Sequence, residues 1–264
     1  MLEAKKVSGI DMCGNGVVLC DNFMMFRSGQ PNCYRSSSSI KNVYARNSSM
    51  VARAFLCKSN FPTVQAILGE VNARNLLVSK YARTPMSQST VSKCLKSLEE
   101  DLIVGRKDEI RLLQTDKLLA ELAENYRPPL RNHRISCKTP TGTDPMAALS
   151  EGAERTSVPV ALTGLSSVNR YAVMQRGEVI EAYCPNITQL LEQSSLVEAN
   201  RFPEIELFEV SEESVFFDSR ENVAGVWAAS PVQTYLELMS GDKRDKETAD
   251  QVKAFIFSEL GRRP

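Results

Sequence analysis

The stretch SQSTVSKCLKSLEEDLIVGRKDEIRLL, residues 87–113, decides the fold that this sequence predicts. Its apolar residues recur at i, i+3, i+4 and i+7, the stripe of one amphipathic helix: Val91, Cys94, Leu95 and Leu98. A serine at 87 or 89 can cap this helix. Two short apolar runs, 102–104 and 110–113, then flank a polar turn. The pattern predicts a capped helix followed by a β-hairpin with a basic tip.

The residues before this stretch predict two more helices. One follows the serine pair at 48–49, and another follows Pro62-Thr63 and carries Val64, Ile67, Leu68 and Val71. A fourth helix is expected at about 116–126. The order helix, helix, capped helix and basic hairpin is typical of a winged helix-turn-helix, which we place at residues 47–127.

The third helix is expected to present its polar leading edge to DNA. In a winged helix-turn-helix the first residues of this helix reach base edges in the major groove. Glutamine can pair with adenine, and serine can contact several bases. The candidates for this edge are Gln88, Ser89, Thr90 and Ser92. Basic residues one turn farther on and at the hairpin tip are suited to phosphates: Lys93, Lys96, Arg106 and Lys107. The alternative is an ordinary packing helix with solvated lysines.

The formal net charge of zero conceals two halves of opposite charge. Residues 1–143 carry 21 Lys and Arg against 12 Asp and Glu, a net of +9. Residues 144–264 carry 11 against 20, a net of −9. A basic half attracts polyanions, whereas an acidic half repels them. Charge does not separate DNA from RNA or a membrane surface, but it indicates that a polyanion site belongs in the first half.

The remaining segments complete a chain of class α+β. Residues 1–46 are interpreted as a short N-terminal β segment and linker, with apolar runs at 17–19 and 23–26 after a Gly-Asn-Gly turn. Residues 128–144, rich in Pro, Thr and Gly, are expected to be a second linker. Residues 145–264 are expected to form one α+β C-terminal domain. Its predicted strands are 158–162, 179–183, 205–210, 214–217 and 223–228, and its last helices are 231–240 and 244–260.

Several segments resemble the AbiEi-like antitoxin family, the transcriptional regulators of bacterial type IV toxin–antitoxin systems. The resemblance of the winged helix lies in SSMVARAFL at 48–56, SQSTVSKCLKSLEEDLIV at 87–104 and IRLLQTDKLLAELAENY at 110–126. GIDMCGNG at 9–16 looks like the IDxxGN turn that precedes the winged helix in longer members. ALTGLSSVNRYA at 161–172 and ASPVQTYLELMSGDKRDKETAD at 229–250 look like the family's C-terminal domain. Because longer members carry more sequence before the turn, residues 1–46 are interpreted as the remnant of a larger domain.

This resemblance implies an antitoxin that represses its own operon. Its DNA partner would be a double-stranded operator with inverted repeats. Its functional partner would be a nucleotidyltransferase-like toxin, which the antitoxin opposes without direct contact being required. The first alternative is a winged helix that acts as a protein-interaction module and binds a toxin or another subunit.

Catalysis and a metal site are not expected. His133, the only histidine, lies in the Pro-rich junction without a nucleophile signature nearby. The spacing of Cys13, Cys20 and Cys33 resembles no zinc motif, so the cysteines are interpreted as reduced, packed thiols. No cofactor motif is complete, because the GxG at 14–16 lacks the third glycine of a dinucleotide fingerprint. Asp11, before a predicted strand, leaves a degenerate nuclease as the second alternative.

The chain is expected to act in the cytoplasm and away from the membrane. No apolar run approaches the ~18 residues that span a bilayer. The first twenty residues contain charged side chains and lack the apolar segment of a signal peptide.

Overall fold

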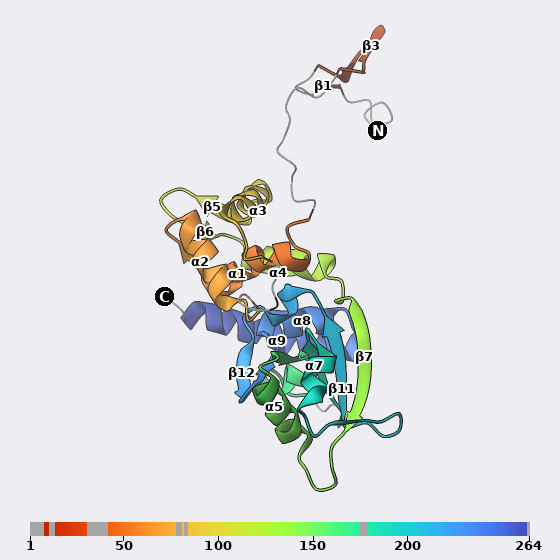
Figure 1. Ribbon diagram of the computed structural model, residues 1–264. Coiled ribbons are helices and arrows are strands. Elements are labelled where there is room, and N and C mark those ends of the chain that lie inside the picture. Colours follow the sequence, from red (N-terminus) through yellow and green to blue (C-terminus); the bar gives the residue numbers. More distant parts are fainter. Residues whose placement is uncertain are drawn as a thin grey trace. The chain divides into compact units, whose positions relative to one another are not determined.

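The computed structural model describes residues 8–10, 14–30, 42–77, 81, 84–174 and 179–262. The chain divides into two compact units, residues 1–39 and 40–264. Helices and strands are mixed throughout the second unit, which confirms the predicted α+β class (Figure 1).

The first unit contains a small antiparallel sheet with strand order β1-β2-β3. Its strands are β1 (Gly9–Ile10), β2 (Gly16–Cys20) and β3 (Phe23–Arg27). The two longer strands coincide with the apolar runs at 17–19 and 23–26, whose pairing brings Val17 opposite Phe26. Every residue of β3 is exposed, so among the described residues this sheet has little core of its own.

The first half of the second unit is mainly helical. It contains η2 (Arg46–Ser48), α1 (Ser49–Cys57), β4 (Asn60–Phe61), α2 (Val64–Arg74), α3 (Gln88–Glu100), β5 (Val104–Arg106), β6 (Ile110–Leu112) and α4 (Thr115–Asn125). The three strands form an antiparallel sheet in the order β4-β6-β5. The predicted helices and the second hairpin strand are therefore confirmed. The first hairpin strand, predicted at 102–104, instead runs from Val104 to Arg106, because Leu102 and Ile103 form the turn that follows α3.

The second half of this unit is built around a seven-stranded mixed sheet with order β10-β7-β11-β9-β8-β13-β12. The strands are β7 (Arg131–Lys138), β8 (Val160–Leu162), β9 (Ile180–Cys184), β10 (Val197–Glu198), β11 (Ile205–Val210), β12 (Arg220–Val223) and β13 (Val226–Ala228). The helices are α5 (Pro145–Thr156), α6 (Gly164–Ser167), α7 (Ile187–Glu192), α8 (Pro231–Met239) and α9 (Lys243–Arg262), with the short 3₁₀ segments η3 (Val168–Arg170) and η4 (Glu213–Phe216).

Successive side chains of the central strands point to opposite faces of this sheet and form an apolar layer on each face. Leu207 of β11 packs in one cluster with residues of α5 and α7. Its neighbour Phe208 packs in another cluster with Val215 and Phe216 of η4. The sheet is therefore buried on both faces along these strands.

Three local predictions for the second half are wrong. Residues 128–144 are not simply a linker, because β7 lies within them and pairs with β11. The first half of β7 is exposed and polar, so it lacks the alternation that marks a strand. Residues 214–217 fall largely in η4 instead of a strand. The strand predicted at 223–228 is two strands, β12 and β13, joined at Gly225, whose φ of +74° suits glycine.

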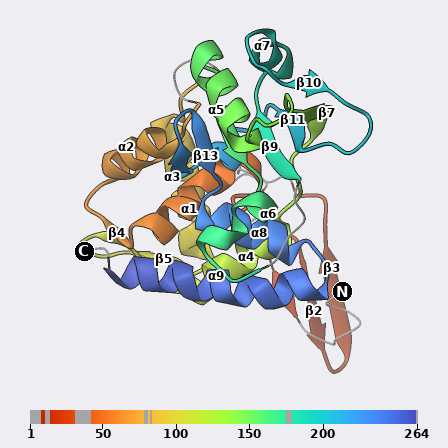
Figure 2. The same ribbon diagram turned by 90° about the horizontal axis from the view of Figure 1, so that it is seen from below.

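One apolar core crosses the boundary that the sequence predicts between residues 47–127 and 145–264. The buried side chains of α1 to α4 share a cluster with those of α8 and α9. Figure 2 shows α9 running alongside α4 and α8, and Lys253 of α9 pairs with Asp116 of α4 at 2.7 Å. The helical half is therefore packed onto the last two helices, while the division into separate domains stays a prediction.

Candidate nucleic-acid interface

Helix α3 begins at a well-formed cap. Ser87 has extended backbone angles, and its hydroxyl accepts a hydrogen bond from the Thr90 amide at 3.2 Å. The Ser87 and Thr90 hydroxyls also lie 2.9 Å apart. A capping serine typically contributes about 1 kcal/mol to helix stability. The local sequence therefore fixes where α3 starts and which residues form its first turn.

The two sides of α3 have opposite environments, as the apolar stripe predicts. The stripe is fully buried: Val91, Cys94, Leu95 and Leu98 have 0% exposure. Burial raises the pKa of Cys94 to about 12, which keeps this thiol protonated. On the other side Gln88, Ser89, Ser92 and Lys96 are exposed, and Thr90 and Lys93 are half-buried. The predicted leading edge therefore faces away from the core.

A tight turn connects α3 to the hairpin. The Ile103 amide donates to the Leu98 carbonyl at 2.9 Å, and the Leu102 amide donates to the Glu99 carbonyl at 3.0 Å. This pair of bonds is a Schellman motif, in which Leu102 adopts the left-handed conformation with φ +57°. The motif fixes the direction in which the hairpin leaves the helix.

The β5–β6 hairpin carries the two predicted basic residues at its tip. Val104 pairs with Leu112 and Arg106 with Ile110, and both Arg106 and Lys107 are exposed. The sequence prediction missed Arg111, which is exposed on β6 beside the buried Ile110. The alternation of β6 could have indicated it, because the residue after a buried strand position points to the other face.

Two of the predicted phosphate contacts are paired within the protein. Arg106 Nε lies 3.4 Å from Glu99 Oε2, and Lys96 Nζ lies 3.8 Å from Glu100 Oε1. Both pairs are at the surface, and the Lys96 side chain is 70% exposed. Exposed ion pairs contribute only about 0–1 kcal/mol. The pairs can therefore be exchanged for contacts with a polyanion.

The helix next to α3 is held by a buried polar network. Arg53 of α1, 2% exposed, donates from Nη1 to the Ser214 carbonyl and to Gln233 Oε1, both at 2.9 Å. Gln233 Nε2 donates to Glu237 Oε1 at 2.8 Å and to the Tyr126 hydroxyl at 3.1 Å. Burial lowers the pKa of Arg53 and raises that of Glu237. This network fixes α1 against α8.

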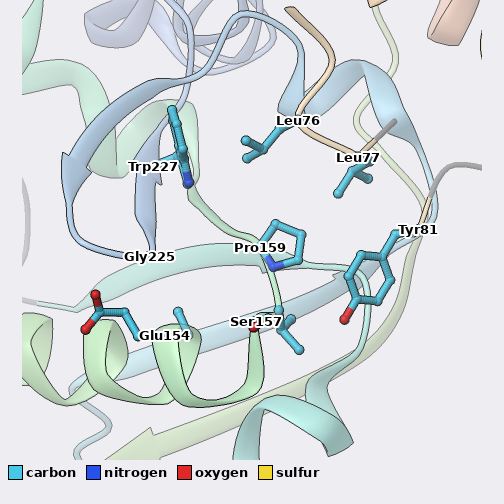
Figure 3. A pocket seen from close by; sticks show the side chains of 10 residues that line it. Leu76, Leu77, Tyr81, Glu154, Ser157, Pro159, Gly225 and Trp227 are labelled. Carbon is cyan, nitrogen blue, oxygen red and sulfur yellow. The ribbon is translucent and has the colours of Figure 1, made fainter. Parts of the chain in front are cut away.

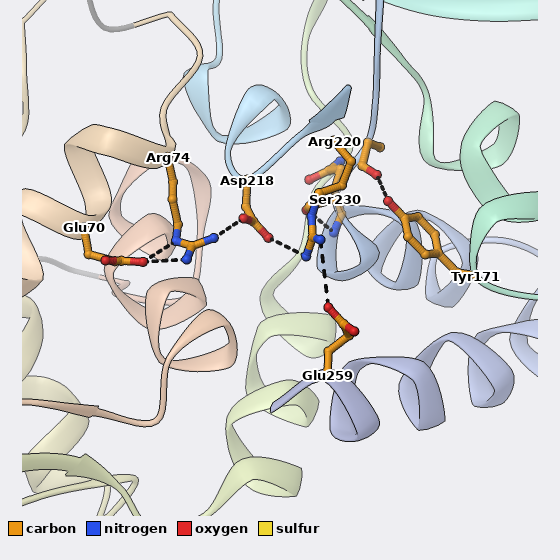
Figure 4. A network of polar contacts seen from close by, with 9 residues as sticks. Glu70, Arg74, Tyr171, Asp218, Arg220, Ser230 and Glu259 are labelled. Carbon is orange, nitrogen blue, oxygen red and sulfur yellow. Dashed lines mark hydrogen bonds and ion pairs between the residues drawn. The ribbon is translucent and has the colours of Figure 1, made fainter. Parts of the chain in front are cut away.

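A second polar network holds the end of α2 (Figure 4). Arg74 Nε donates to Glu70 Oε1 at 2.6 Å, and its Nη1 donates to Asp218. Asp218 also lies 3.5 Å from Arg220, which is 3.9 Å from Glu259 of α9. The chain of charges runs from α2 across the loop before β12 to α9. Together with the network at Arg53, it attaches both α1 and α2 to the second half.

Of the side chains named for the enzymatic and metal alternatives, only those of His133 and Cys20 lie within the described residues. His133 is exposed on β7 and lies opposite Glu209 of β11. Asp11, Cys13 and Cys33 lie outside the described residues. Among the residues that are described, no three His, Cys, Asp or Glu side chains could hold a metal ion. No helix in the described part of the chain is long and apolar enough to cross a membrane.

Comparison with known families identifies the class of protein. The profile described as transcriptional regulator, AbiEi antitoxin, type IV toxin–antitoxin system matches residues 111–257, from β6 into α9. The chain belongs to this family of regulators, as the sequence resemblance predicted. No curated protein and no solved structure matches the chain. The matched segment begins after α3, so the candidate DNA contacts at 88–107 lie outside it.

Proposed function

We propose that the chain is a DNA-binding repressor, and that residues 47–127 act as a winged helix-turn-helix with α3 as its recognition helix. The observation that carries the proposal is the exposed polar edge of α3, set against a fully buried apolar stripe and next to a basic hairpin. The order α1, β4, α2, α3, β5, β6 supports it, as does membership of a family of transcriptional regulators.

The proposed contacts divide by chemistry. Side chains on the first turn and a half of α3 would read base edges in the major groove: Gln88, Ser89, Thr90 and Ser92. Basic side chains farther along the helix and on the hairpin would bind phosphates: Lys93, Lys96, Arg106 and Lys107. Arg106 and Lys96 would exchange Glu99 and Glu100 for phosphates, at a cost that the surface position of these pairs keeps small.

Membership of this family supports a biological role for the proposed repressor. As a type IV antitoxin the chain would act in the bacterial cytoplasm and repress the operon that encodes it. An operator with inverted repeats would bind two copies related by a two-fold axis. The family description supports a toxin partner. We propose that this toxin is nucleotidyltransferase-like and is opposed without direct contact being required.

A gel-shift titration over a salt series tests the interface. Lys96→Ala should flatten the dependence of log affinity on log salt by about one unit, because one phosphate contact releases about one counterion. Lys243→Ala is the matched control, since Lys243 also forms an exposed pair with a glutamate four residues on, at 4.0 Å. Equal slopes for the two variants would remove Lys96 from the interface.

A purification of the same chain distinguishes the repressor from the protein-interaction alternative. Co-purification with the product of the neighbouring gene, in the absence of nucleic acid and without any operator binding, would favour that alternative. Operator binding by the isolated chain would favour the repressor.

A further inference from the structure

Strand β3 exposes apolar side chains on both faces of its sheet. The strand order is β1-β2-β3, so one side of β3 has no neighbouring strand among the described residues. Its first four side chains are each more than half exposed: Phe23 56%, Met24 59%, Met25 58% and Phe26 64%. Because side chains alternate along a strand, both faces carry exposed apolar groups. A contiguous apolar surface of this kind marks a contact with another protein surface.

The edge strands of the seven-stranded sheet, in contrast, are protected against pairing. β10 has only two residues, and β12 carries Arg220 and Glu221 and has a register irregularity. Short length, charged side chains and bulges are the usual means of blocking a free strand edge. β3 pairs with β2 in unbroken register and holds no charge between Phe23 and Phe26. Its edge therefore lacks these protections.

A pocket of about 430 Å³ on the second unit shows a different arrangement of apolar side chains (Figure 3). Its walls include Leu76, Leu77 and Trp227. Leu77 is buried and the other two are half-buried, so folding of the second unit already covers much of their surface. The side chains of β3 have no comparable cover among the described residues. A partner is therefore needed at β3.

The backbone of β3 offers hydrogen bonds to such a partner. The Leu19 amide of β2 donates to Ser8 Oγ at 2.8 Å, and the Leu19 carbonyl accepts from Ser8 Oγ at 3.4 Å, so both groups face β1. Leu19 lies opposite Met24, and antiparallel pairs alternate between hydrogen-bonded and non-hydrogen-bonded pairs. The amide and carbonyl of Met24 therefore point away from β2, as do those of Phe26, two residues on.

We propose that β3 pairs antiparallel with β3 of a second copy, across a two-fold axis at Met25, and makes the chain a dimer. A two-fold contact pairs the same residues in both directions. With the axis at Met25, Met24 of each copy lies opposite Phe26 of the other, and their outward amides and carbonyls pair. An axis at Met24 would instead place Phe26 opposite Asn22 of the turn. An axis at Phe26 would place Met24 opposite Ser28, beyond the strand.

The sequence of β3 is self-complementary in this register. Met25 lies opposite its own copy, and Met24 lies opposite Phe26, a favourable sulfur–aromatic pair. Phe23 lies opposite Arg27, whose guanidinium can stack on the ring. Arg27 is the only charged residue of the strand, and its two copies lie at opposite ends of the pair. No like charges face each other, so the strand fits a second copy of itself.

The exposed area is sufficient for a weak dimer. Covering the four apolar side chains would remove roughly 450 Å² of surface per copy, or about 900 Å² in total, since a large side chain of this kind buries about 150–250 Å². This area lies near the lower limit of specific interfaces, so we expect a dissociation constant on the order of 10 μM.

Sedimentation equilibrium of the full chain tests the pairing. At about 100 μM, ten times the expected dissociation constant, the wild type should be mainly dimeric. Met25→Lys should raise this constant at least about tenfold, because two like charges would face each other at the axis. Met25 is exposed, so the lysine removes no core contact. Val197→Lys is the matched control, because Val197 is also an exposed apolar residue on an edge strand, and it should dimerise as the wild type does.

Two outcomes of this measurement overturn the proposal. One is a wild type that stays monomeric, which would assign the exposed side of β3 to the chain's own second unit or to a different protein. The other is a Met25→Lys chain that dimerises as the wild type does.

Cross-linking tests the register. The background replaces Cys13, Cys20 and Cys33 with serine. Met25→Cys should form a disulfide between copies under mild oxidation, because Cα atoms of a non-hydrogen-bonded pair lie about 4.5 Å apart. Met24→Cys should not, because its two copies would lie more than about 7 Å apart. Equal cross-linking of the two variants overturns the proposed pairing.

The dimer would bring two copies of α3 to an operator with inverted repeats, a consequence that rests on the proposed function. In a gel shift the wild type should bind two half-sites at least about tenfold more tightly than Met25→Lys does, while both bind a single half-site equally. Equal affinities for two half-sites would refute this connection and leave the dimer standing. A chain that binds no operator would refute the proposed function, while sedimentation would still decide the dimer.

Discussion

The helical half has two sides that are stabilised differently. Its front is the exposed side of α3 with the β5–β6 hairpin, and its back is the side of α1 and α2 that packs on the second half. At the front, α3 and the β5–β6 hairpin expose polar side chains, and the ion pairs of Lys96 and Arg106 there are long and solvated. At the back, α1 and α2 meet the second half through buried groups such as Arg53 and the nearly buried Asp218. Buried polar groups that lose a partner are costly, whereas exposed ones are not. Substitutions at the back should therefore change the free energy of unfolding most. Side chains at the front can exchange their partners for a ligand at little cost.

The largest expected effect is the loss of Arg53. Arg53→Ala leaves Gln233 Oε1 and the Ser214 carbonyl without their donor and opens a cavity in the core. The free energy of unfolding should fall by about 3 kcal/mol, measured by urea denaturation. Arg111→Ala, at an exposed arginine of β6, should change it by less than about 0.5 kcal/mol. Similar losses in both variants would show that burial does not distinguish the two arginines.

The second effect depends on pH. Burial raises the pKa of Glu237 above its ordinary value of 4.5, so above pH 4.5 the folded chain retains a proton that the unfolded chain has released. This contribution to stability is complete below pH 4.5 and is lost as pH rises through the folded pKa. Glu237→Gln, which cannot ionise, should therefore gain stability relative to wild type as pH rises.

The size of this gain should be about 1.4 kcal/mol for each unit by which the folded pKa exceeds 4.5. Urea denaturation of both proteins at several pH values provides the measurement. A difference in unfolding free energy that stays constant from pH 4 to pH 8 would mean that Glu237 ionises in the folded protein as it does in water.

A smaller effect is expected at the end of α2. Arg74→Ala removes the contact with Asp218, whose side chain is 9% exposed, and should cost about 1–2 kcal/mol in unfolding free energy. Arg155→Ala is matched to it, because Arg155 also pairs with a glutamate four residues earlier but at an exposed site. That control should cost less than about 0.5 kcal/mol. Equal costs would assign the effect of Arg74 to its local helix pair alone.

The two sides also differ in how much of their structure could be predicted from the sequence. The cap at Ser87 and the stripe from Val91 to Leu98 are local patterns, so the helix and its exposed edge followed from spacing alone. The burial of Arg53 depends on Gln233, 180 residues away, and no local pattern indicates it. Strand β7 was missed for a related reason: its polar first half is defined by pairing with the distant β11.

The smallest effect on stability should accompany the largest effect on recognition. Gln88→Ala changes an exposed residue on the first turn of α3, so the free energy of unfolding should stay within about 0.5 kcal/mol of wild type. The affinity difference between the operator and variants with single base substitutions should shrink by about 1–3 kcal/mol at one position, because a bidentate pair with adenine is lost.

Competition gel shifts with a set of base-substituted operators measure this loss. Gln193→Ala, at an exposed residue after α7, should leave every operator ranked as in the wild type. If Gln88→Ala weakens all operators equally, the side chain positions the helix on phosphates and does not read a base. That result would keep α3 at the DNA but would move sequence recognition to the exposed Ser89 or Ser92, or to the half-buried Thr90, whose hydroxyl also lies 2.9 Å from that of Ser87.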